Sequence, residues 1–192
     1  MYKVCMVSLE CPKNQVDAEM MLSLLKNAGF EICSAEAEAD AIIINTCGFI
    51  EAAKAEAIEN ILEASNYKVD GNCKALIVTG CLAERYKDEV ITEMPEIDAI
   101  VGIGANEDIV DVVNRVIDGE GGISKFADKD KLDMDSDRIL ASPRYTAYLR
   151  IADGCDNCCT YCTIPFIRGR FRSRTMESVI DEGKRLALRG VK

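Results

Sequence analysis

The sequence predicts an α/β protein: a doubly wound parallel sheet, followed by the first strand, loop and helix of a second module. Two patterns support this fold class. Short apolar runs alternate with amphipathic stretches in the first region, which is typical of parallel strands joined by crossover helices. Charge also divides the chain, because residues 1–142 hold 13 Lys and Arg against 28 Asp and Glu, whereas residues 143–192 hold 10 against 5. At 192 residues and 48% hydrophobic composition, the chain is long enough for one packed domain and part of another.

Apolar runs give the strands of the first domain, which we place at residues 1–119. The expected strands are 4–9, 41–46, 75–79 and 99–103. Amphipathic stretches between and after them predict helices at 14–28, 50–64, 84–93 and 106–117. Gly29 stands where a left-handed cap should end the first helix.

A Gly-rich and then charged stretch, residues 120–143, interleaves Asp with Lys and predicts an acidic linker with no core of its own. The second module, residues 144–192, should open with a strand at 146–151. Its helix is expected at 176–188, ending before Gly190.

In that last helix, four apolar residues are expected to face inward: Met176, Val179, Ile180 and Leu186. The chain ends where a further parallel strand should begin. One strand, loop and helix cannot close a barrel, so we expect a truncated sequence.

Composition excludes several function classes. The chain has no His, which excludes Ser-His-Asp and Cys-His catalysis and imidazole metal ligands. Ten cysteines are about 5% of the residues, below the level of a disulfide scaffold. The N-terminus lacks the apolar run of a signal peptide, and no run approaches the ~20 residues of a membrane span. We therefore expect a soluble cytoplasmic protein with reduced cysteines.

Three of the cysteines, Cys155, Cys159 and Cys162, are spaced CxxxCxxC directly after a predicted strand. Three thiols on one short loop can hold three irons of a 4Fe-4S cluster and leave the fourth iron open to another ligand. A zinc site is the alternative. It would need Cys158 as its fourth ligand, and the adjacency of Cys158 to Cys159 strains simultaneous binding.

A second set follows from topology, since Cys11, Cys47 and Cys81 come just after the strands 4–9, 41–46 and 75–79. Ligands of parallel sheets bind at the carboxyl ends of the strands, so these thiols can converge there. The alternative is that each is a small buried hydrophobe.

Three further cysteines lie inside or beside strand runs or in a loop, and for them burial is the expected role: Cys5, Cys33 and Cys73.

The motifs around both sets resemble the methylthiotransferase family. SLECPKN at 8–14, NTCGFI at 45–50 and TGCL at 79–82 are similar to its N-terminal domain. GCDNCCTYC, followed by IPFIRGRFRSR, resembles the start of its radical S-adenosylmethionine domain. The resemblance covers essentially the whole chain, with two departures: Glu10 replaces a usual Gly, and Cys158 is an additional thiol.

The resemblance implies an N-terminal methylthiotransferase domain, the first unit of a radical S-adenosylmethionine barrel, and two 4Fe-4S clusters. The cluster on the CxxxCxxC loop would bind S-adenosylmethionine and cleave it reductively to a radical that abstracts a hydrogen from the substrate. The cluster on Cys11, Cys47 and Cys81 would carry the sulfur that is methylated and transferred. Tyr161 is expected either to contact the adenine or to pack as an ordinary aromatic residue.

CPKN and the Gly-Phe-Ile after Cys47 are similar to the branch that methylthiolates the β-carbon of an aspartate in ribosomal protein S twelve. The tRNA adenosine branch is the alternative. An electron donor such as flavodoxin or ferredoxin and a monomeric state are expected, as is inactivity of the fragment alone. A two-cluster electron-transfer module is disfavoured, because ferredoxins fill every iron position with protein thiolate.

Four arginines recur at every second residue after the loop: Arg168, Arg170, Arg172 and Arg174. In an extended segment all four would point to one face. That row could bind the carboxylate of S-adenosylmethionine, the acidic first domain or rRNA. The alternative is a solvated edge strand.

Overall fold

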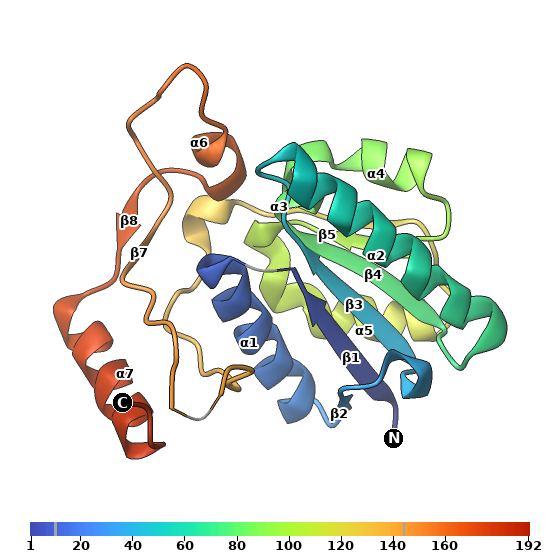
Figure 1. Ribbon diagram of the computed structural model, residues 1–192, viewed down its shortest axis with the longest axis horizontal. Coiled ribbons are helices and arrows are strands. Elements are labelled where there is room, and N and C mark those ends of the chain that lie inside the picture. The colour runs from blue at the N-terminus through green and yellow to red at the C-terminus, as the bar shows by residue number, and fades with distance from the viewer. Residues whose placement is uncertain (10, 144) are drawn as a thin grey trace.

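The computed structural model describes residues 1–9, 11–143 and 145–192, so Glu10 lies outside the described residues. Six parallel strands form one sheet in the order β2-β1-β3-β4-β5-β6 (Figure 1). The sheet strands are β1 (Lys3–Ser8), β2 (Glu31–Cys33), β3 (Ala41–Thr46), β4 (Ala75–Gly80), β5 (Ala99–Val101) and β6 (Ile123–Lys125). The helices of this domain are α1 (Pro12–Asn27), α2 (Glu51–Asp70), α3 (Cys81–Tyr86), α4 (Asp88–Glu93) and α5 (Ile109–Ile117), with 3-10 turns η1 (Glu36–Glu38) and η2 (Ile103–Asp108). The predicted doubly wound α/β fold is confirmed.

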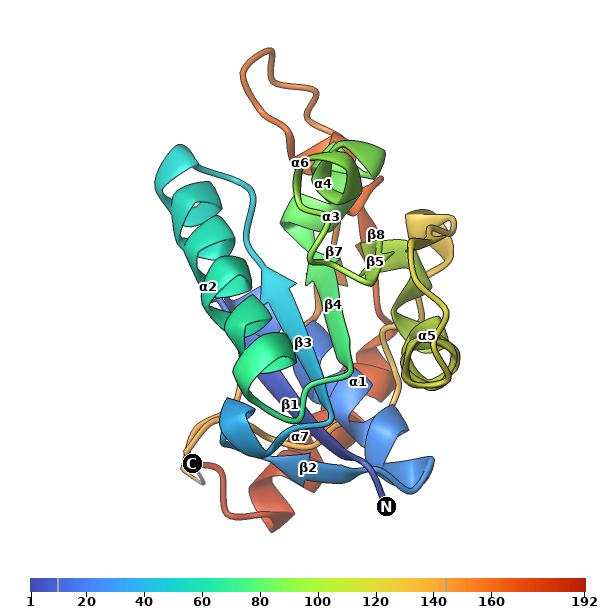
Figure 2. The same ribbon diagram turned by 90° about the vertical axis from the view of Figure 1, so that its right-hand side faces the viewer.

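The sheet forms the middle layer, with α2 on one face and α1 and α5 on the other (Figure 2). Every residue of β3 and β4 is buried, which explains why their sequences are continuous apolar runs. Successive side chains alternate between the layers: Ile43 packs in the α1 and α5 core, and Ile42 and Ile44 pack in the α2 core. Cys5 and Cys73 are buried in the α2 core, as expected for thiols outside the two sets.

Short elements account for most of the differences from the predicted segments. β2 and β6 have three residues each, too few to show a period-two pattern. The helix expected at 84–93 is two helices, because the backbone reverses at Lys87 with φ 43°. The longest described helix, α2, has 20 residues, and none of the described helices is long and apolar enough to cross a membrane.

The segment 120–143, expected to be an acidic linker with no core of its own, contributes a strand to the sheet and a buried residue to a small core. Its first part is β6, the sixth strand of the sheet, and Lys129–Lys131 forms a 3-10 turn, η3. Leu132 is buried with Cys81, Ile103 and Ile167 in a small core. The charged composition concealed this attachment, because single apolar residues spaced along the segment make the contacts.

The second module contains β7 (Ala152–Asp153), α6 (Ile164–Arg168), β8 (Arg172–Ser173) and α7 (Met176–Leu188). β7 and β8 pair antiparallel. The strand expected at 146–151 is not one, because a strand needs a neighbour for its ladder. The Arg174 N–H donates to the Ile151 carbonyl at 3.0 Å, while pairing begins only at Ala152.

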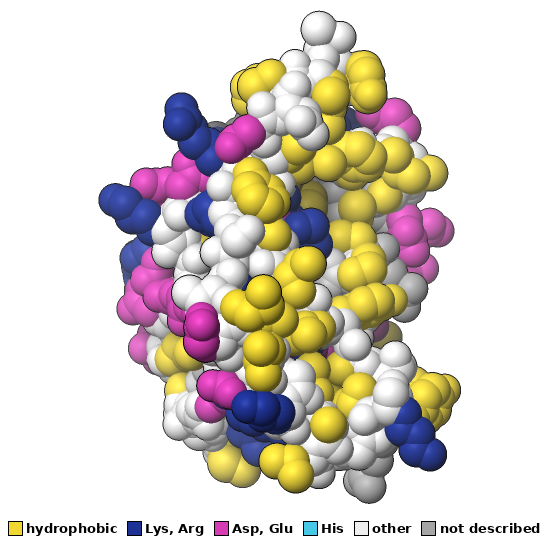
Figure 3. Space-filling model, turned by 90° about the vertical axis from the view of Figure 1, so that its left-hand side faces the viewer, with side chains coloured by type: hydrophobic (Ala, Val, Ile, Leu, Met, Phe, Trp, Pro, Cys, Tyr) yellow, Lys and Arg dark blue, Asp and Glu magenta, His cyan; other side chains and the backbone are white. Residues whose placement is uncertain are grey.

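The helix α7 has the predicted bounds, but only part of its predicted inward side is buried. Met176 and Ile180, expected to face inward, are 71% and 47% exposed, whereas Leu186 is buried. Figure 3 faces the side of the molecule where this module lies and shows apolar side chains gathered there. A helix buries only the side that meets a partner, and in the described part of the chain α7 is held through Glu182 and Leu186.

Candidate functional site

Three cysteines lie at one edge of the sheet, at the carboxyl ends of three neighbouring strands. Cys47 follows β3 directly, Cys81 follows β4 directly, and Cys11 caps the N-terminus of α1 three residues after β1. In the register of the sheet, Ser8 lies opposite Asn45, and Asn45 lies opposite Thr79. Cys47 and Cys81 are therefore level with each other, and Figure 2 shows β3 and β4 pointing toward α3 and α6.

Asn14, which was not among the residues predicted for the site, connects these three strand ends. It is fully buried, its backbone N–H donates to Cys11 Sγ at 3.4 Å, and its side-chain oxygen accepts from Cys81 Sγ at 3.3 Å. Its Nδ2 donates to the Thr46 carbonyl at 2.7 Å, next to Cys47. The CPKN motif, in which Asn14 is the last residue, was the feature of the sequence that pointed to this position. The structural role of Asn14 is to hold the three cysteine-bearing segments together.

Gly80 allows β4 to reach this edge. Its φ is 91°, and a Cβ atom there would lie 2.4 Å from the Thr46 carbonyl oxygen and 2.6 Å from Asn45 Oδ1. These neighbours are backbone or tightly held side chain, so no rotamer change relieves the contact. The glycine before Cys81 is therefore required by both conformation and space.

Gly80→Ala is expected to destabilise the iron-free protein by about 2 kcal/mol more than Gly119→Ala. Gly119 also has positive φ, 99°, but a Cβ there meets nothing within 4 Å, so its substitution costs only the backbone strain of about 1 to 2 kcal/mol. Urea unfolding of both variants gives the comparison. Equal losses of stability would contradict the close approach at Gly80.

Cys81 is the buried cysteine of this edge, and its surroundings change the pKa of its thiol. It is 6% exposed. Burial raises the pKa of its thiol to about 11, against the opposing effect of the Arg168 guanidinium, and the neighbouring Cys11 and Cys47 raise it further. Arg168 Nη2 lies 3.7 Å from Cys81 Sγ and comes from the second module. The three cysteines thus interact electrostatically, and a cation from outside the first domain lies beside them.

The three residues fit the ligand set of a 4Fe-4S cluster. All the cysteines are free thiols. In the described part of the chain no three Cys, Asp or Glu side chains surround a single point as they would around one metal ion. Three cysteine ligands of a cluster bind three different irons, so their sulfurs need not meet at one point. A thiol-only donor set at a strand edge, next to a cation, suits such a cluster.

The second set lies on the loop 154–163, which projects beyond the sheet edge next to α6 (Figure 1). Gly154 opens the loop with φ 76°, and a Cβ there would lie 1.9 Å from the Arg170 carbonyl oxygen. The Cys155 N–H donates to the Gly169 carbonyl at 3.1 Å, which closes the base of the loop. Cys159 is exposed, and Cys155 and Cys162 are partly exposed.

The two other notable side chains of the loop are also exposed. Tyr161 is 88% exposed, so it does not pack as an ordinary core aromatic. Cys158 is exposed, and its φ of 48° lies in the left-handed region, which residues other than glycine rarely adopt.

Alkylation of the iron-free protein at about pH 8 is expected to modify Cys158 and Cys159 and to leave Cys5 unmodified. Cys5 is 3% exposed, and burial raises its pKa to about 12. Because the unfolded pKa is about 8.5, the unfolded chain loses this proton first. The free energy of unfolding therefore falls as pH rises between those two values. Peptide mass spectrometry reads the labels, with urea-unfolded protein as the control in which Cys5 reacts; labelling of native Cys5 at pH 8 would contradict the burial.

Buried ion pairs join the two modules. We call one group the Asp17 cluster; its members are Lys13, Asp17, Arg150, Asp153 and Arg168. Asp17 accepts from Arg150 and from Arg168, each at 2.5 Å, and Asp153 accepts from Lys13 at 2.9 Å. Burial would raise the pKa of Asp153, but Arg168 and Lys13 outweigh it and hold that pKa below its usual value.

A second group, farther along α1, contains Glu19, Arg138 and Glu182. Arg138 is 6% exposed and bonds to Glu19 at 2.6 Å and to Glu182 at 2.7 Å. α1 therefore carries acidic residues on a side that the end of the segment 120–143 and the second module cover.

The arginine row does not lie on one extended face, so that premise is wrong. α6 continues to Arg168, and Gly169, with φ 77°, turns the chain before the short strand β8. Arg168 and Arg174 are buried in ion pairs with Asp17 and Glu182, and Arg172 pairs with Asp130 at 2.9 Å. Of the four, Arg170 alone is exposed.

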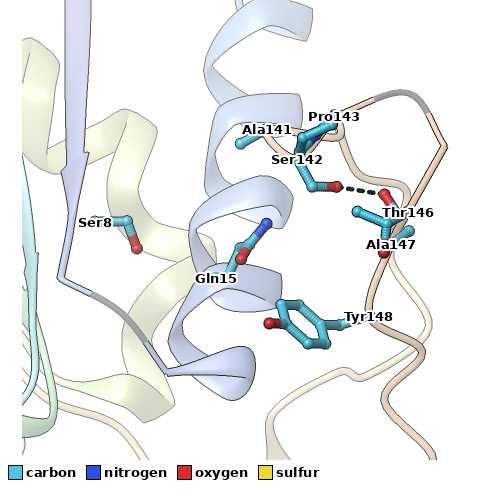
Figure 4. A pocket seen from close by; sticks show the side chains of 8 residues that line it. All are labelled: Ser8, Gln15, Ala141, Ser142, Pro143, Thr146, Ala147 and Tyr148. Atoms are coloured by element: carbon cyan, nitrogen blue, oxygen red, sulfur yellow. Dashed lines mark hydrogen bonds between the residues drawn. The ribbon is translucent and has the colours of Figure 1, made fainter.

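A cavity of about 380 Å³ lies between α1 and the segment 141–148 (Figure 4). Ser8, at the end of β1, lines it together with Gln15 and Tyr148, and the Ser142 hydroxyl donates to the Thr146 carbonyl at 2.7 Å. Polar and small apolar side chains line it, and none of its described lining residues is charged. It opens at the end of β1, the strand that leads to Cys11.

A parallel α/β domain with three cysteines at its edge is joined by buried ion pairs to a module with a CxxxCxxC loop, which defines an α/β protein with two separate sets of three thiols. The fold matches the solved radical S-adenosylmethionine methyltransferase TsrM from Kitasatospora setae. The TM-score is 0.67 at 14% identity, over 100% of this chain and 46% of TsrM. A family model described as Uncharacterized protein family UPF0004 matches residues 3–102, and the chain belongs to this family.

Curated relatives carry a more specific name. The chain is 52% identical to "Ribosomal protein uS12 methylthiotransferase RimO" of Desulforamulus reducens, over 100% of this chain and 44% of that protein. It is 50% identical to the protein of the same name in Pelotomaculum thermopropionicum, over 99% of this chain and 43% of the relative. The protein of the same name in Clostridium perfringens is 49% identical, over 100% of this chain and 43% of that protein. The chain thus spans less than half the length of these relatives.

Proposed function

We propose that this protein is a radical S-adenosylmethionine methylthiotransferase that modifies the β-carbon of an aspartate in ribosomal protein uS12. The observation that carries the proposal is the pairing of two three-cysteine sets on docked modules. Arg168, six residues after Cys162 of the loop, reaches to 3.7 Å from Cys81 at the sheet edge. The names of relatives near 50% identity support the same activity and substrate.

The residues for the two 4Fe-4S clusters are those identified above. Cys155, Cys159 and Cys162 would hold the cluster that binds S-adenosylmethionine, and the sheet-edge cysteines Cys11, Cys47 and Cys81 would hold the other. When bound, these groups supply the reductive cleavage of S-adenosylmethionine and the sulfur for transfer.

Other residues of the protein would hold the cysteine-bearing segments in place and contact the cofactor or the substrate. Asn14 fixes the three strand ends, and Arg85 Nη1 donates to the Gly48 carbonyl at 2.9 Å, which holds the segment after Cys47 on α3. Tyr161, exposed on the loop, is available to contact an adenine. Arg170 is the exposed cation nearest in sequence to this loop, and we assign it a contact with the carboxylate of the cofactor or of the target aspartate.

The cellular setting is part of the same proposal. The protein would act as a monomer in the cytoplasm, where it meets uS12, and would take electrons from a flavodoxin or ferredoxin. Ten free cysteines suit a reducing compartment.

The test is the mass of uS12 from cells with and without the gene. A methylthio group that is present only with the gene supports the proposal. Loss of a methylthiolated adenosine from tRNA instead, with uS12 unchanged, would assign the protein to the tRNA branch.

A further inference from the structure

Arg168 belongs to the second module, but its guanidinium lies among residues of the first domain. It is the last residue of α6, the helix directly after the cysteine loop, and it is 4% exposed. Its Nη1 donates to Asp17 at 2.5 Å and to Asp153 at 3.4 Å. Its Nη2 donates to Asn14 Oδ1 and reaches Cys81 Sγ at 3.7 Å. One guanidinium thus joins the module boundary to the sheet-edge cysteines.

Positive and negative charges are not equal in number in the Asp17 cluster, where Arg168 lies. The Asp17 cluster holds three cations and two carboxylates, so it has one positive charge in excess. Lys13 is partly exposed and shares its charge with water, but the Arg150 and Arg168 side chains are only 3% and 5% exposed. Burial would lower the pKa of Arg168, but Asp17, Cys81 and Asp153 hold it above its usual value. The excess charge is therefore that of the partly exposed Lys13. Among the described residues, the Nη2 side of Arg168 contacts Asn14 and Cys81 and no carboxylate, so a negative charge added on the sulfur side would meet a buried cation there.

Packing fixes this contact in place. Ile167, the residue before Arg168, is buried with Cys81 and with Leu132 of the segment after β6. This hydrophobic contact between the modules holds the backbone that carries Arg168 close to Cys81.

We infer that Arg168 tunes the cluster held by Cys11, Cys47 and Cys81 from across the module boundary, raising its reduction potential. Reduction adds one electron, supplied by the external donor, and no bond to protein atoms forms or breaks. A buried guanidinium that donates toward a ligand sulfur stabilises the added negative charge. The inference rests on the proposed function and deepens it. The reduction potential of the sheet-edge cluster is raised only while the two modules are docked, because Arg168 comes from the second module.

The experiment uses the whole protein with Cys155, Cys159 and Cys162 replaced by Ala, so that only the sheet-edge cluster is loaded. A redox titration followed by electron paramagnetic resonance measures its midpoint potential. Arg168→Met should shift that potential to a more negative value. Arg168→Lys, which keeps the charge but not the planar fork, should give a smaller shift in the same direction.

Arg150→Met is the matched control. Arg150 is equally buried and pairs with the same carboxylate, Asp17, at 2.5 Å, but its described contacts include no cysteine. A structural effect of losing a partner of Asp17 would appear in both variants, whereas the inference requires a larger shift in Arg168→Met.

Equal shifts in the two Met variants, or no shift in either, would overturn the role of Arg168. Should Arg168→Met fail to fold, Arg168→Lys against Arg150→Lys provides the same comparison. Failure of the parent protein to load any sheet-edge cluster is a different outcome, because it overturns the proposed function itself.

Discussion

Anaerobic reconstitution of the protein with iron and sulfide is expected to load about eight irons per chain, as two 4Fe-4S clusters. Replacing Cys155, Cys159 and Cys162 with Ala should halve that load to about four irons, because the sheet-edge cysteines are a separate ligand set on other segments of the chain. Iron analysis together with the brown absorbance of the clusters measures both values. A structural zinc protein would remain colourless.

Two further variants sharpen this experiment. Replacing the sheet-edge set, Cys11, Cys47 and Cys81, should also leave about four irons, now on the loop. Replacing the other three cysteines of the first domain, Cys5, Cys33 and Cys73, removes the same number of thiols and should leave the load at about eight. Full loading of the loop variant, or a wild-type load that never exceeds about four, would refute the two-cluster hypothesis.

Ribosomal protein uS12 from cells with the gene is expected to carry a methylthio group that is absent after deletion of the gene. By atomic composition the modified peptide gains about 46 mass units, with no change of charge. The methylthio group should be fully lost on deletion, because uS12 cannot itself supply the two three-cysteine sets that the reaction requires. Mass spectrometry of the tryptic peptide that contains the target aspartate gives the result.

Complementation separates the contributions of this chain in the same cells. The complete gene should restore the modified mass, and the same gene with Cys81→Ala should not. A gene with Cys33→Ala is the matched control and should restore it, because Cys33 lies on β2, away from the two cysteine sets. Digested tRNA from the same strains is the second measurement. An unchanged uS12 together with a lost modified adenosine would contradict the ribosomal substrate.

Much of the fold could be read from local patterns. β3 has the predicted bounds, and α7 does as well, because a run of buried apolar residues and a capped amphipathic helix each leave a signal within their own length. The spacing of the loop cysteines and the strand ends before Cys11, Cys47 and Cys81 is likewise local. From these, the sequence by itself determined the α/β class and the six candidate ligands.

What only the tertiary structure decided is how the two modules meet. Asp17 and Glu19 on an amphipathic helix would be expected in solvent, yet they are 3% and 1% exposed because arginines from distant segments cover them. Arg168 and Asp17 are 151 positions apart in the sequence. No periodicity links residues so far apart, since their pairing depends on the docking of two surfaces. The four arginines, which would share one face in an extended segment, are therefore split between buried and exposed positions by the turn at Gly169 and by the carboxylates of the other module.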